Sequence, residues 1–358
     1  MTLTTTIVGC GAVAQGLYRK PLQTLEKRGL LRISALTDPV AEHSAAMRRH
    51  FPNAAVCTNI EASPQADLTL ILTPAHLHCS QTIHALRNNS HVLCEKPMAN
   101  STEECARMNA AAGESGRILA VGMIRRFFPA FSALQQLIEL DQLGVLQRFE
   151  YREGGKFEWD VRTPAAFRPR RDGGTGVLFD IGPHVVDHLS WTFGKLAVTA
   201  YRDNALTGIE SDAAFDVVSP RCPGSIKISW DSPHGNELRV FGSRAEAVLR
   251  VDRFDQLAVR SGGEFQLQPS SASFAADAQD PPAARLAPRS YAQAIYAQLI
   301  QVIRAIRLGE KPSADGAAGQ QSVAVLEAAL KIADVLPAPW LSSEEQAASR
   351  RLHWSHCP

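Results

Sequence analysis

The chain of 358 residues carries 37 basic and 36 acidic side chains, and its formal net charge of +1 argues against nucleic-acid or anionic-membrane partners. It has no apolar run of about eighteen residues that could span a bilayer, and its start lacks the pattern of a signal peptide. Seven cysteines without pairwise spacing favour the cytoplasm over a disulfide framework. This length accommodates two domains, each with its own core.

A short β-branched strand over residues 4–8 opens the chain and leads into a run of small residues. Gly9, Gly11 and Ala14 have the spacing Gly-x-Gly-x-x-Ala of a dinucleotide-binding turn. Gly9 permits the tight turn, Gly11 lets the backbone approach a pyrophosphate, and Ala14 lets the following helix pack close to the strand. The N-terminus of that helix then faces the phosphates. The same small residues can also simply close a strand–helix turn.

Leu31–Thr37 predicts a second strand, and Asp38 follows it directly. A carboxylate at this place can accept hydrogen bonds from the adenosine ribose hydroxyls, and it repels a 2′-phosphate. Asp38 therefore favours NAD over NADP. The alternative is a helix N-cap before Pro39, and one residue can serve in both ways.

Strands and helices alternate from Thr4 to about Arg125, which predicts an α/β fold with a Rossmann-type, doubly wound parallel sheet over residues 1–125. The further strands are expected at Ala54–Cys57, Ala66–Thr73, His91–Cys94 and Ile118–Met123, and the helices at Val40–His50, His76–Asn88 and after Ser101, where Ser101 and Glu104 form a capping-box pair.

After Leu143 the pattern changes to consecutive strands with few helices between them, which predicts an α+β domain with a large, mainly antiparallel sheet over 126–340. Two amphipathic helices close this region and can pack back on the first domain, and residues 341–358 form a polar tail. We expect the sheet's outer face to be apolar and covered by a second subunit, giving a homodimer or homotetramer. The expected strands are Gln147–Arg152, Ala197–Tyr201, Ala213–Ser219, Ser225–Trp230, Glu237–Phe241, Ala247–Val251 and Gln256–Val259. The first closing helix has its apolar stripe at Tyr291, Ile295, Leu299, Val302 and Ile306, and the second has its stripe at Val323, Leu326, Leu330 and Ile332–Val335.

Glu95, Lys96 and Pro97 follow the strand that ends at Cys94. Because ligands of open parallel sheets bind beyond the carboxyl ends of the strands, Lys96 is predicted at the edge of a cofactor site. The alternative is a solvated surface lysine, since lysines are seldom buried.

A glycine-containing run from Gly173 leads to Asp180, His184 and His188, which are spaced four residues apart. A helix would place all three on one face, with Pro183 in its first turn. Asp180 can equally act as a helix cap, and His184 can be a core histidine with satisfied hydrogen bonds.

The glycine turn, the Glu95-Lys96-Pro97 triplet and the Asp180-x-x-x-His184 pair together resemble the glucose–fructose oxidoreductase / inositol dehydrogenase (Gfo/Idh/MocA) family. The resemblance extends to the Thr73-Pro74 turn with His78 and to Arg126 with its following phenylalanine, and so covers nearly the whole chain. Two departures are Ala75, where such proteins often have Asn, and Thr175, which interrupts what is often three glycines.

The resemblance implies an NAD(H)-dependent dehydrogenase that moves a hydride between nicotinamide and a secondary alcohol or ketone of a sugar, a sugar derivative or a cyclitol. It implies that His184 accepts the hydroxyl proton, that Lys96 stabilises the developing alkoxide, and that Asp180 orients the sugar or the imidazole. By the same resemblance the Lys96–Pro97 bond is expected to be cis. The implied cofactor-binding residues are Gly9, Gly11, Ala12, Val13, Ala14, Asp38, Thr73, Pro74, His78, Glu95 and Lys96.

Four residues are expected at the substrate. Arg126 lies at the domain junction, and Arg168 lies with two further arginines before the glycine run, where it can recognise an anionic group or simply be solvated. Phe157 and Trp159 can stack on a sugar ring or pack beneath a loop.

His76, His78, Cys79 and His84 cluster in the sequence, and such residues can bind zinc. We nevertheless expect no metal, because hydride transfer to a nicotinamide needs none. Two rival functions remain open: a non-catalytic NAD-binding sugar sensor, which would usually have lost the lysine or the histidine, and a glycosidase that uses NAD transiently.

Overall fold

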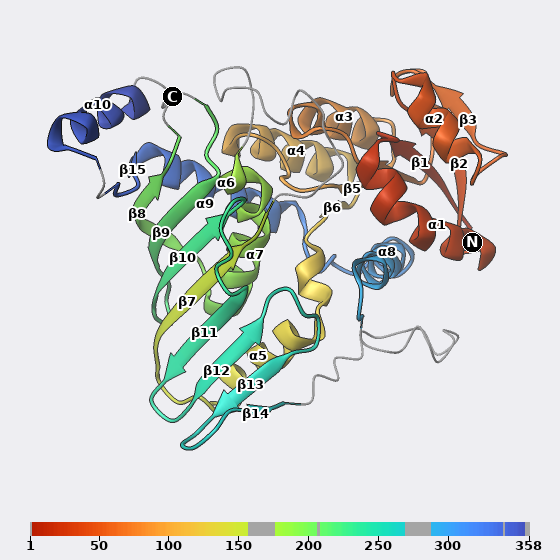
Figure 1. Cartoon of the computed structure of the whole chain (residues 1–358). Helices are drawn as coiled ribbons and strands as arrows, with labels where there is room; N and C mark the ends of the chain where they lie inside the picture. The colour runs from red at the N-terminus through yellow and green to blue at the C-terminus, as the bar shows by residue number, and fades with distance from the viewer. Residues whose placement is uncertain (1, 157–175, 206–207, 269–287, 339–340, 355–358) are drawn as a thin grey trace. The chain divides into compact units, whose positions relative to one another are not determined.

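The computed structural model describes residues 2–156, 176–205, 208–268, 288–338 and 341–354 (Figure 1). The chain divides into two compact units. Unit 1 consists of Met1–Phe127 and Ser290–Val323, and unit 2 consists of Phe128–Arg289 and Ala324–Pro358. Residues 290–323 therefore return to the unit that begins the chain.

Unit 1 is built on a parallel sheet of six strands in the order β3-β2-β1-β4-β5-β6. The strand order reverses between β1 and β4, and ligands of doubly wound sheets bind at such a switch point. The predicted Rossmann-type sheet is confirmed. Its strands are β1 (Leu3–Val8), β2 (Leu31–Thr37), β3 (Ala55–Cys57), β4 (Leu68–Ile71), β5 (His91–Cys94) and β6 (Leu119–Val121).

Helices pack on both sides of this sheet, and two buried apolar clusters lie between the layers. Ile295, Leu299 and Val302 of α8 belong to one cluster, together with Leu22 and Leu25 of α1. The stripe predicted along the first closing helix is therefore the face that packs in unit 1. The helical elements are η1 (Ala14–Tyr18), α1 (Arg19–Lys27), α2 (Ala41–Arg48), α3 (Ala75–Arg87), α4 (Thr102–Ser115), η2 (Ile124–Phe127), α8 (Tyr291–Leu308) and the first half of α9 (Gly316–Lys331).

Two local details refine the sequence prediction in unit 1. The side chain of Ser101 caps α4 by accepting a hydrogen bond from Glu104 N (3.1 Å), as expected, whereas the Glu104 carboxylate reaches Asn100 N (3.1 Å). The helix after the glycine turn contains a π-helical segment, Ala14–Tyr18, where a regular helix was expected. Such segments are often found at functional sites.

Unit 2 contains a sheet of nine strands in the order β14-β13-β12-β11-β7-β10-β9-β8-β15. The pairs β7–β10 and β8–β15 are parallel and the other pairs are antiparallel, so the predicted large, mainly antiparallel sheet is confirmed. The strands are β7 (Leu146–Gly154), β8 (Ala197–Asp203), β9 (Asp212–Val218), β10 (Pro223–Ser229), β11 (Glu237–Gly242), β12 (Glu246–Arg250), β13 (Leu257–Arg260), β14 (Gln266–Leu267) and β15 (Ala333–Val335).

The inner face of the unit 2 sheet is apolar and packs against helices. Phe149 of β7 stacks on Phe193 at the end of α7, with ring centroids 4.5 Å apart, and both side chains are fully buried. The helices of unit 2 are α5 (Pro129–Glu139), α6 (Val177–Asp180), α7 (Gly182–Phe193), α10 (Ser343–Trp354) and the second half of α9.

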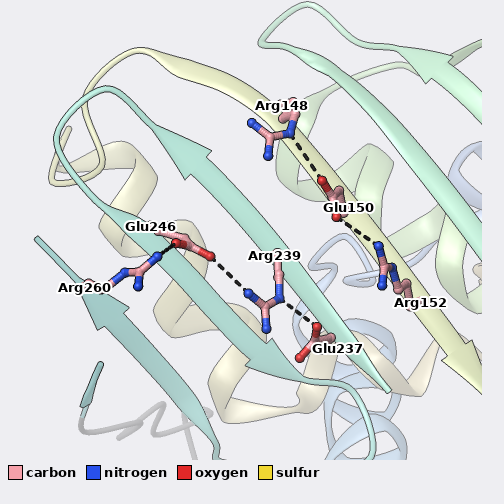
Figure 2. Close-up of polar contacts among 7 residues, drawn as sticks. All are labelled: Arg148, Glu150, Arg152, Glu237, Arg239, Glu246 and Arg260. Carbon is pink, nitrogen blue, oxygen red and sulfur yellow. Dashed lines mark hydrogen bonds and ion pairs between the residues drawn. The ribbon is translucent and has the colours of Figure 1, made fainter. Parts of the chain in front are cut away.

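The outer face of the same sheet is charged, which corrects the expectation of an apolar face. Arg148, Glu150 and Arg152 alternate along β7 with the buried Phe149 and Tyr151, so they point to the other side of the sheet. Figure 2 shows these three side chains in a row of ion pairs along β7, and a second row that joins residues of β11, β12 and β13. The pairs are Arg148–Glu150 (3.3 Å), Arg152–Glu150 (3.3 Å), Arg239–Glu237 (2.7 Å), Arg239–Glu246 (3.4 Å) and Arg260–Glu246.

The end of the chain differs from the prediction in two places. The stripe at 332–335 is not helical, because α9 ends at Lys331 and Ala333–Val335 pairs with β8 as a parallel edge strand. The polar tail contains the helix α10, whose Arg350 lies 3.7 Å from Asp334. Within the described ranges no helix is long and apolar enough to cross a membrane.

Candidate functional site

The glycine turn lies at the carboxyl end of β1. Gly9 has φ +90°, and a Cβ there would lie 2.7 Å from the main chain of Leu72, so the turn and the close approach to the end of β4 both require glycine. At Gly11 an added Cβ would meet no atom within 4 Å, so no protein atom blocks an approach to the backbone at that point. Ala14 is fully buried in the unit 1 core, while Ala12 and Val13 are half-buried.

Asp38 is tied to the glycine turn from the end of β2. Its Oδ2 accepts a hydrogen bond from Cys10 N (2.8 Å), and its Oδ1 accepts one from Val40 N (2.9 Å) at the start of α2. His43 Nδ1 lies 3.3 Å from the same Oδ1. Asp38 thus stabilises the start of α2 and the glycine turn together. Burial and the Asp38 carboxylate raise the pKa of the Cys10 thiol to about 12, so this cysteine stays protonated.

Thr73 and Pro74 form the turn between β4 and α3, and His78 lies in the first turns of α3. The Thr73 hydroxyl donates to Gln81 Oε1 (2.6 Å), and Pro74 is exposed. The ring of His78 is 1% exposed, and each of its nitrogens faces a main-chain carbonyl oxygen. Both ring nitrogens of His78 therefore contact main-chain atoms of the protein.

Lys96 lies in the turn that follows β5, at the same carboxyl edge of the sheet as the glycine turn. The Lys96–Pro97 peptide bond is cis, which confirms the expectation drawn from the resemblance. Lys96 is half-buried, and its main-chain N–H donates to Glu95 Oε2 (3.0 Å). The predicted triplet therefore stands where a Rossmann-type unit binds its ligand.

Glu95 forms a buried network that the sequence did not predict. Tyr18 Oη donates to Glu95 Oε1 (2.5 Å), and Gln298 Nε2 of α8 donates to Tyr18 Oη (3.3 Å). A Cβ at Gly122 would lie 2.8 Å from the same carboxylate oxygen. Burial raises the pKa of Glu95, while Tyr18 and Lys96 act in the opposite direction; burial and Glu95 raise the pKa of Tyr18 well above its ordinary value.

Arg126 belongs to η2 and is 9% exposed. Its guanidinium donates to the carbonyl of Ser313, in the segment that precedes α9 within the same unit. Asp315 is close enough for the Arg126 charge to contribute to the lowered pKa of that carboxyl. The structure thus gives Arg126 a role in joining two segments of unit 1.

Asp180 and His184 lie on α6 and α7 of unit 2, and both are half-buried among largely buried neighbours. Asp180 Oδ2 accepts a hydrogen bond from Trp230 Nε1 (3.1 Å), at the end of β10. His188, which the spacing placed on the same face, is fully buried, with its ring centroid 3.8 Å from that of Phe131. The accessible pair is therefore Asp180 and His184.

Glu210 holds the start of the helix that carries Asp180. Its Oε1 accepts from Leu178 N (3.0 Å), its carbonyl accepts from Val177 N (2.9 Å), and it is 1% exposed. A Cβ at Gly176 would overlap both groups. A buried carboxylate at a helix start satisfies N–H groups that have no partner within the helix. No sequence pattern linked Glu210 to this helix, because the contact spans 32 residues.

Several predicted residues are not placed by these observations. Phe157, Trp159 and Arg168 lie outside the described residues. Lys96 belongs to unit 1, whereas Asp180 and His184 belong to unit 2. Across the described part of the chain, no group of three or more His, Cys, Asp or Glu side chains could hold a metal ion.

Two family models match the chain. Residues 3–123 match the model described as "Oxidoreductase family, NAD-binding Rossmann fold", and residues 131–248 match the "GFO/IDH/MocA C-terminal domain". The chain belongs to the Gfo/Idh/MocA family. Its unit 1 therefore carries the family's NAD-binding fold, and the resemblance inferred from the motifs is confirmed.

Curated Gfo/Idh/MocA relatives include cyclitol dehydrogenases. The chain is 28% identical over 214 residues to the NADP-dependent scyllo-inositol 2-dehydrogenase of Bacillus subtilis, a match that covers 58% of this chain and 57% of that protein. It is 32% identical over 150 residues to the inositol 2-dehydrogenase of Ralstonia nicotianae, covering 40% of this chain and 44% of that protein. The chain thus spans about half the length of the curated relatives it matches.

Solved Gfo/Idh/MocA structures match over nearly the whole chain. A levoglucosan dehydrogenase in complex with NADH and levoglucosan has a TM-score of 0.78 at 18% identity, covering 92% of this chain and 97% of that one. An aldose-aldose oxidoreductase from Caulobacter crescentus has a TM-score of 0.76 at 22% identity, covering 93% and 97%. At these identities the likeness shows that the fold is shared.

Proposed function

We propose that this chain is an NAD(H)-dependent oxidoreductase that moves a hydride between nicotinamide and a secondary alcohol or ketone of a sugar, a sugar derivative or a cyclitol. The observation that carries the proposal is the Glu95–Lys96–Pro97 turn at the carboxyl edge of a Rossmann sheet, the same edge at which the glycine turn lies. Family membership and the names of the relatives support the same activity.

The residues of unit 1 fit an NAD molecule. The open space at Gly11 leaves room for a pyrophosphate beside the backbone, and Asp38 supplies carboxylate oxygens for ribose hydroxyls. When bound, nicotinamide supplies the carbon that accepts or returns the hydride. Asp38 favours NAD, although relatives named for NADP and for NAD both exist.

The proton chemistry is assigned to Lys96, Asp180 and His184. A carbinol that loses a hydride must also lose its hydroxyl proton, and the His184 imidazole accepts that proton near neutral pH. Lys96 donates a hydrogen bond to the same oxygen and stabilises its developing negative charge. Asp180, held by Trp230, orients the substrate or the imidazole. Arg126, Phe157, Trp159 and Arg168 remain predictions for substrate contact.

The test is reduction of NAD by a panel of inositols, anhydrosugars, aldoses, glycosides and nucleotide sugars. With the best substrate, Lys96→Met and His184→Asn should each reduce kcat by about 10²- to 10⁴-fold, whereas the controls Lys27→Met and His84→Asn should retain wild-type rates. NADH binding without any turnover would instead indicate a sensor. Release of sugar from a glycoside without net NADH formation would indicate a glycosidase. Full activity in both site variants would contradict the assigned roles.

We also propose that the chain forms a homodimer or homotetramer in the cytoplasm. The six cysteines within the described residues are free thiols, as suits a reducing compartment. The alternating Arg and Glu rows of Figure 2 present both signs of charge, so this face can pair with a second copy of itself. Sedimentation at low and high salt tests this, because such an interface should weaken as salt is added. A monomer at every salt concentration would refute it.

A further inference from the structure

His78 is a buried titratable residue that the family resemblance counts among the cofactor-binding residues, but the proposed proton chemistry gives it no role. Its ring is 1% exposed, and it lies near the start of α3, one turn after the Thr73–Pro74 segment. Nε2 lies 2.7 Å from the carbonyl oxygen of Thr73, and Nδ1 lies 2.8 Å from the carbonyl oxygen of Pro97. Both distances are those of good hydrogen bonds.

The two carbonyls belong to different turns. Thr73 follows β4, and Pro97 follows β5 directly after Lys96. β4 and β5 are parallel neighbours whose ladder register ends at Ile71 opposite Cys94, and the bond from Glu95 N to Ile71 O (2.9 Å) lies just beyond it. Past that point the imidazole of His78 bridges the two turns.

An imidazole suits this bridge because its two nitrogens lie on opposite edges of a rigid ring. The neutral ring donates to one carbonyl, and the tautomer decides which; the imidazolium donates to both. Burial lowers the pKa of His78, while the carbonyls of Pro97 and Thr73 act in the opposite direction. The imidazolium therefore links the two turns by two hydrogen bonds, whereas the neutral ring donates to one carbonyl and packs its unprotonated nitrogen against the other.

We propose that His78 is a positioning residue that links the Thr73 turn to the Lys96–Pro97 turn and thereby fixes Lys96 at the edge of the cofactor site. The effect on rate rests on the proposed dehydrogenase function, but the effect on the turn does not. Since displacement of a catalytic group by about 1 Å can cost about 10²-fold in rate, the link should matter for kcat more than for cofactor affinity.

His78→Phe retains a ring but removes both hydrogen bonds, and His78→Gln retains an amide group with two N–H donors. The matched control is His84→Phe on the same helix, where the histidine is half-buried and contacts Asn88 (2.7 Å). The readouts are kcat and KM with the best substrate, the Kd for NADH by fluorescence, the melting temperature, and hydrogen exchange of residues 95–99 with NADH bound.

We expect His78→Phe to lower kcat by about 10- to 100-fold while the Kd for NADH changes by less than about threefold, and His78→Gln to recover part of the rate. Exchange at residues 95–99 should accelerate in His78→Phe and stay unchanged in His84→Phe. The proposal is overturned if kcat is unchanged, or if kcat falls only in step with the folded fraction and His78→Gln recovers nothing.

If the wild-type chain oxidises no member of the panel, the dehydrogenase assignment fails and the exchange experiment alone decides for His78. Faster exchange at 95–99 in His78→Phe, with the control unchanged, then still supports the link between the turns. Unchanged exchange in that folded variant overturns it.

Discussion

Two segments carry the proposed catalytic residues: one in unit 1 with Lys96, and one in unit 2 with Asp180 and His184. Both are stabilised by the same kind of contact. In each, a buried glutamate carboxylate accepts a main-chain N–H of the segment: Glu95 accepts from Lys96 N and Glu210 accepts from Leu178 N. Each carboxylate also lies against a glycine at which a Cβ would not fit.

The two contacts differ in the other groups that each glutamate binds. Glu95 receives the hydroxyl of Tyr18, which lies in the π-helical segment after the glycine turn and is itself bonded to Gln298 of α8. Glu210, which lies in the loop before β9, acts at the start of α6 through its carboxylate and its main-chain carbonyl. A substitution that disturbs Glu95 should therefore also affect the glycine turn, whereas one that disturbs Glu210 should affect only α6 and α7, which carry Asp180 and His184.

The strongest test of this comparison places a methyl group at each glycine. Gly176→Ala should destabilise the chain by about 3 kcal/mol or more, because the Cβ overlaps both the carboxyl and the main-chain carbonyl of Glu210. Gly122→Ala should cost about 1–3 kcal/mol, since it meets only the end of the Glu95 side chain.

Urea unfolding measures both losses, and NADH titration shows whether only Gly122→Ala weakens cofactor binding. Gly113→Ala is the control, because nothing lies within 4 Å of its Cβ position in α4. Equal effects of Gly122→Ala and Gly176→Ala on NADH binding would contradict the claim that only the Glu95 contact is linked to the glycine turn.

Tyr18→Phe should cost about 1–3 kcal/mol, because it leaves a buried carboxylate without its hydroxyl donor. It should also raise the pKa of Glu95 further, since Tyr18 acts to lower it. A carboxyl whose pKa is raised on folding loses stability as pH rises above its unfolded value of 4.5. The variant's deficit should therefore be smaller at pH 4.5 than at pH 7.

Thermal unfolding across that pH range measures the effect. The control is Tyr291→Phe, because the side chain of Tyr291 is 47% exposed. A deficit that does not change with pH would show that the hydroxyl does not stabilise the ionised Glu95.

His91 predicts a smaller, pH-dependent effect in unit 1. Its Nδ1 accepts from Ile118 N (3.0 Å), and burial, followed by the charge of Arg117, lowers its pKa. A histidine whose pKa is lowered on folding stabilises the chain above 6.5, and this contribution is lost as pH falls below that value. His91→Asn, which keeps an acceptor but does not titrate, should flatten the stability profile below pH 6.5. An unchanged slope in urea unfolding would contradict this.

The smallest effect is expected on the outer sheet face of unit 2. Glu246 accepts from Arg239 (3.4 Å) and Arg260, and its side chain is 12% exposed (Figure 2). Glu246→Gln should cost less than about 1 kcal/mol at low salt and still less at high salt. Glu264→Gln, at an exposed turn of the same sheet, is the control. A loss that does not change with salt would show that these ion pairs act by packing.

Local patterns predicted much of the fold. Apolar runs and turn residues predict the strands of both sheets except β14 and β15. Ser101 is predicted as a cap, and the triplet at Lys96 is predicted at a strand end because parallel strands share one carboxyl edge. These features depend on residues close in the sequence.

The features that the sequence did not reveal depend on distant partners. Tyr18 and Glu95 are 77 residues apart, and Glu210 lies 32 residues from Leu178, so no local spacing marks either contact. The short strand Ala333–Val335 continues an apolar helix stripe, and only pairing with β8 makes it extended. The alternation along β7 places Arg148, Glu150 and Arg152 on the outer face, and their charges contradict the expectation that this face is apolar.

The most direct test of the proposed proton chemistry is the kcat of Lys96→Met, His184→Asn and the double variant with the best substrate. If both residues serve one hydroxyl, each single variant should lose about 10²- to 10⁴-fold, and the double variant should be about as slow as the slower single, because groups that act together are not additive. Losses that multiply in the double variant, or a single variant with wild-type kcat, would contradict this.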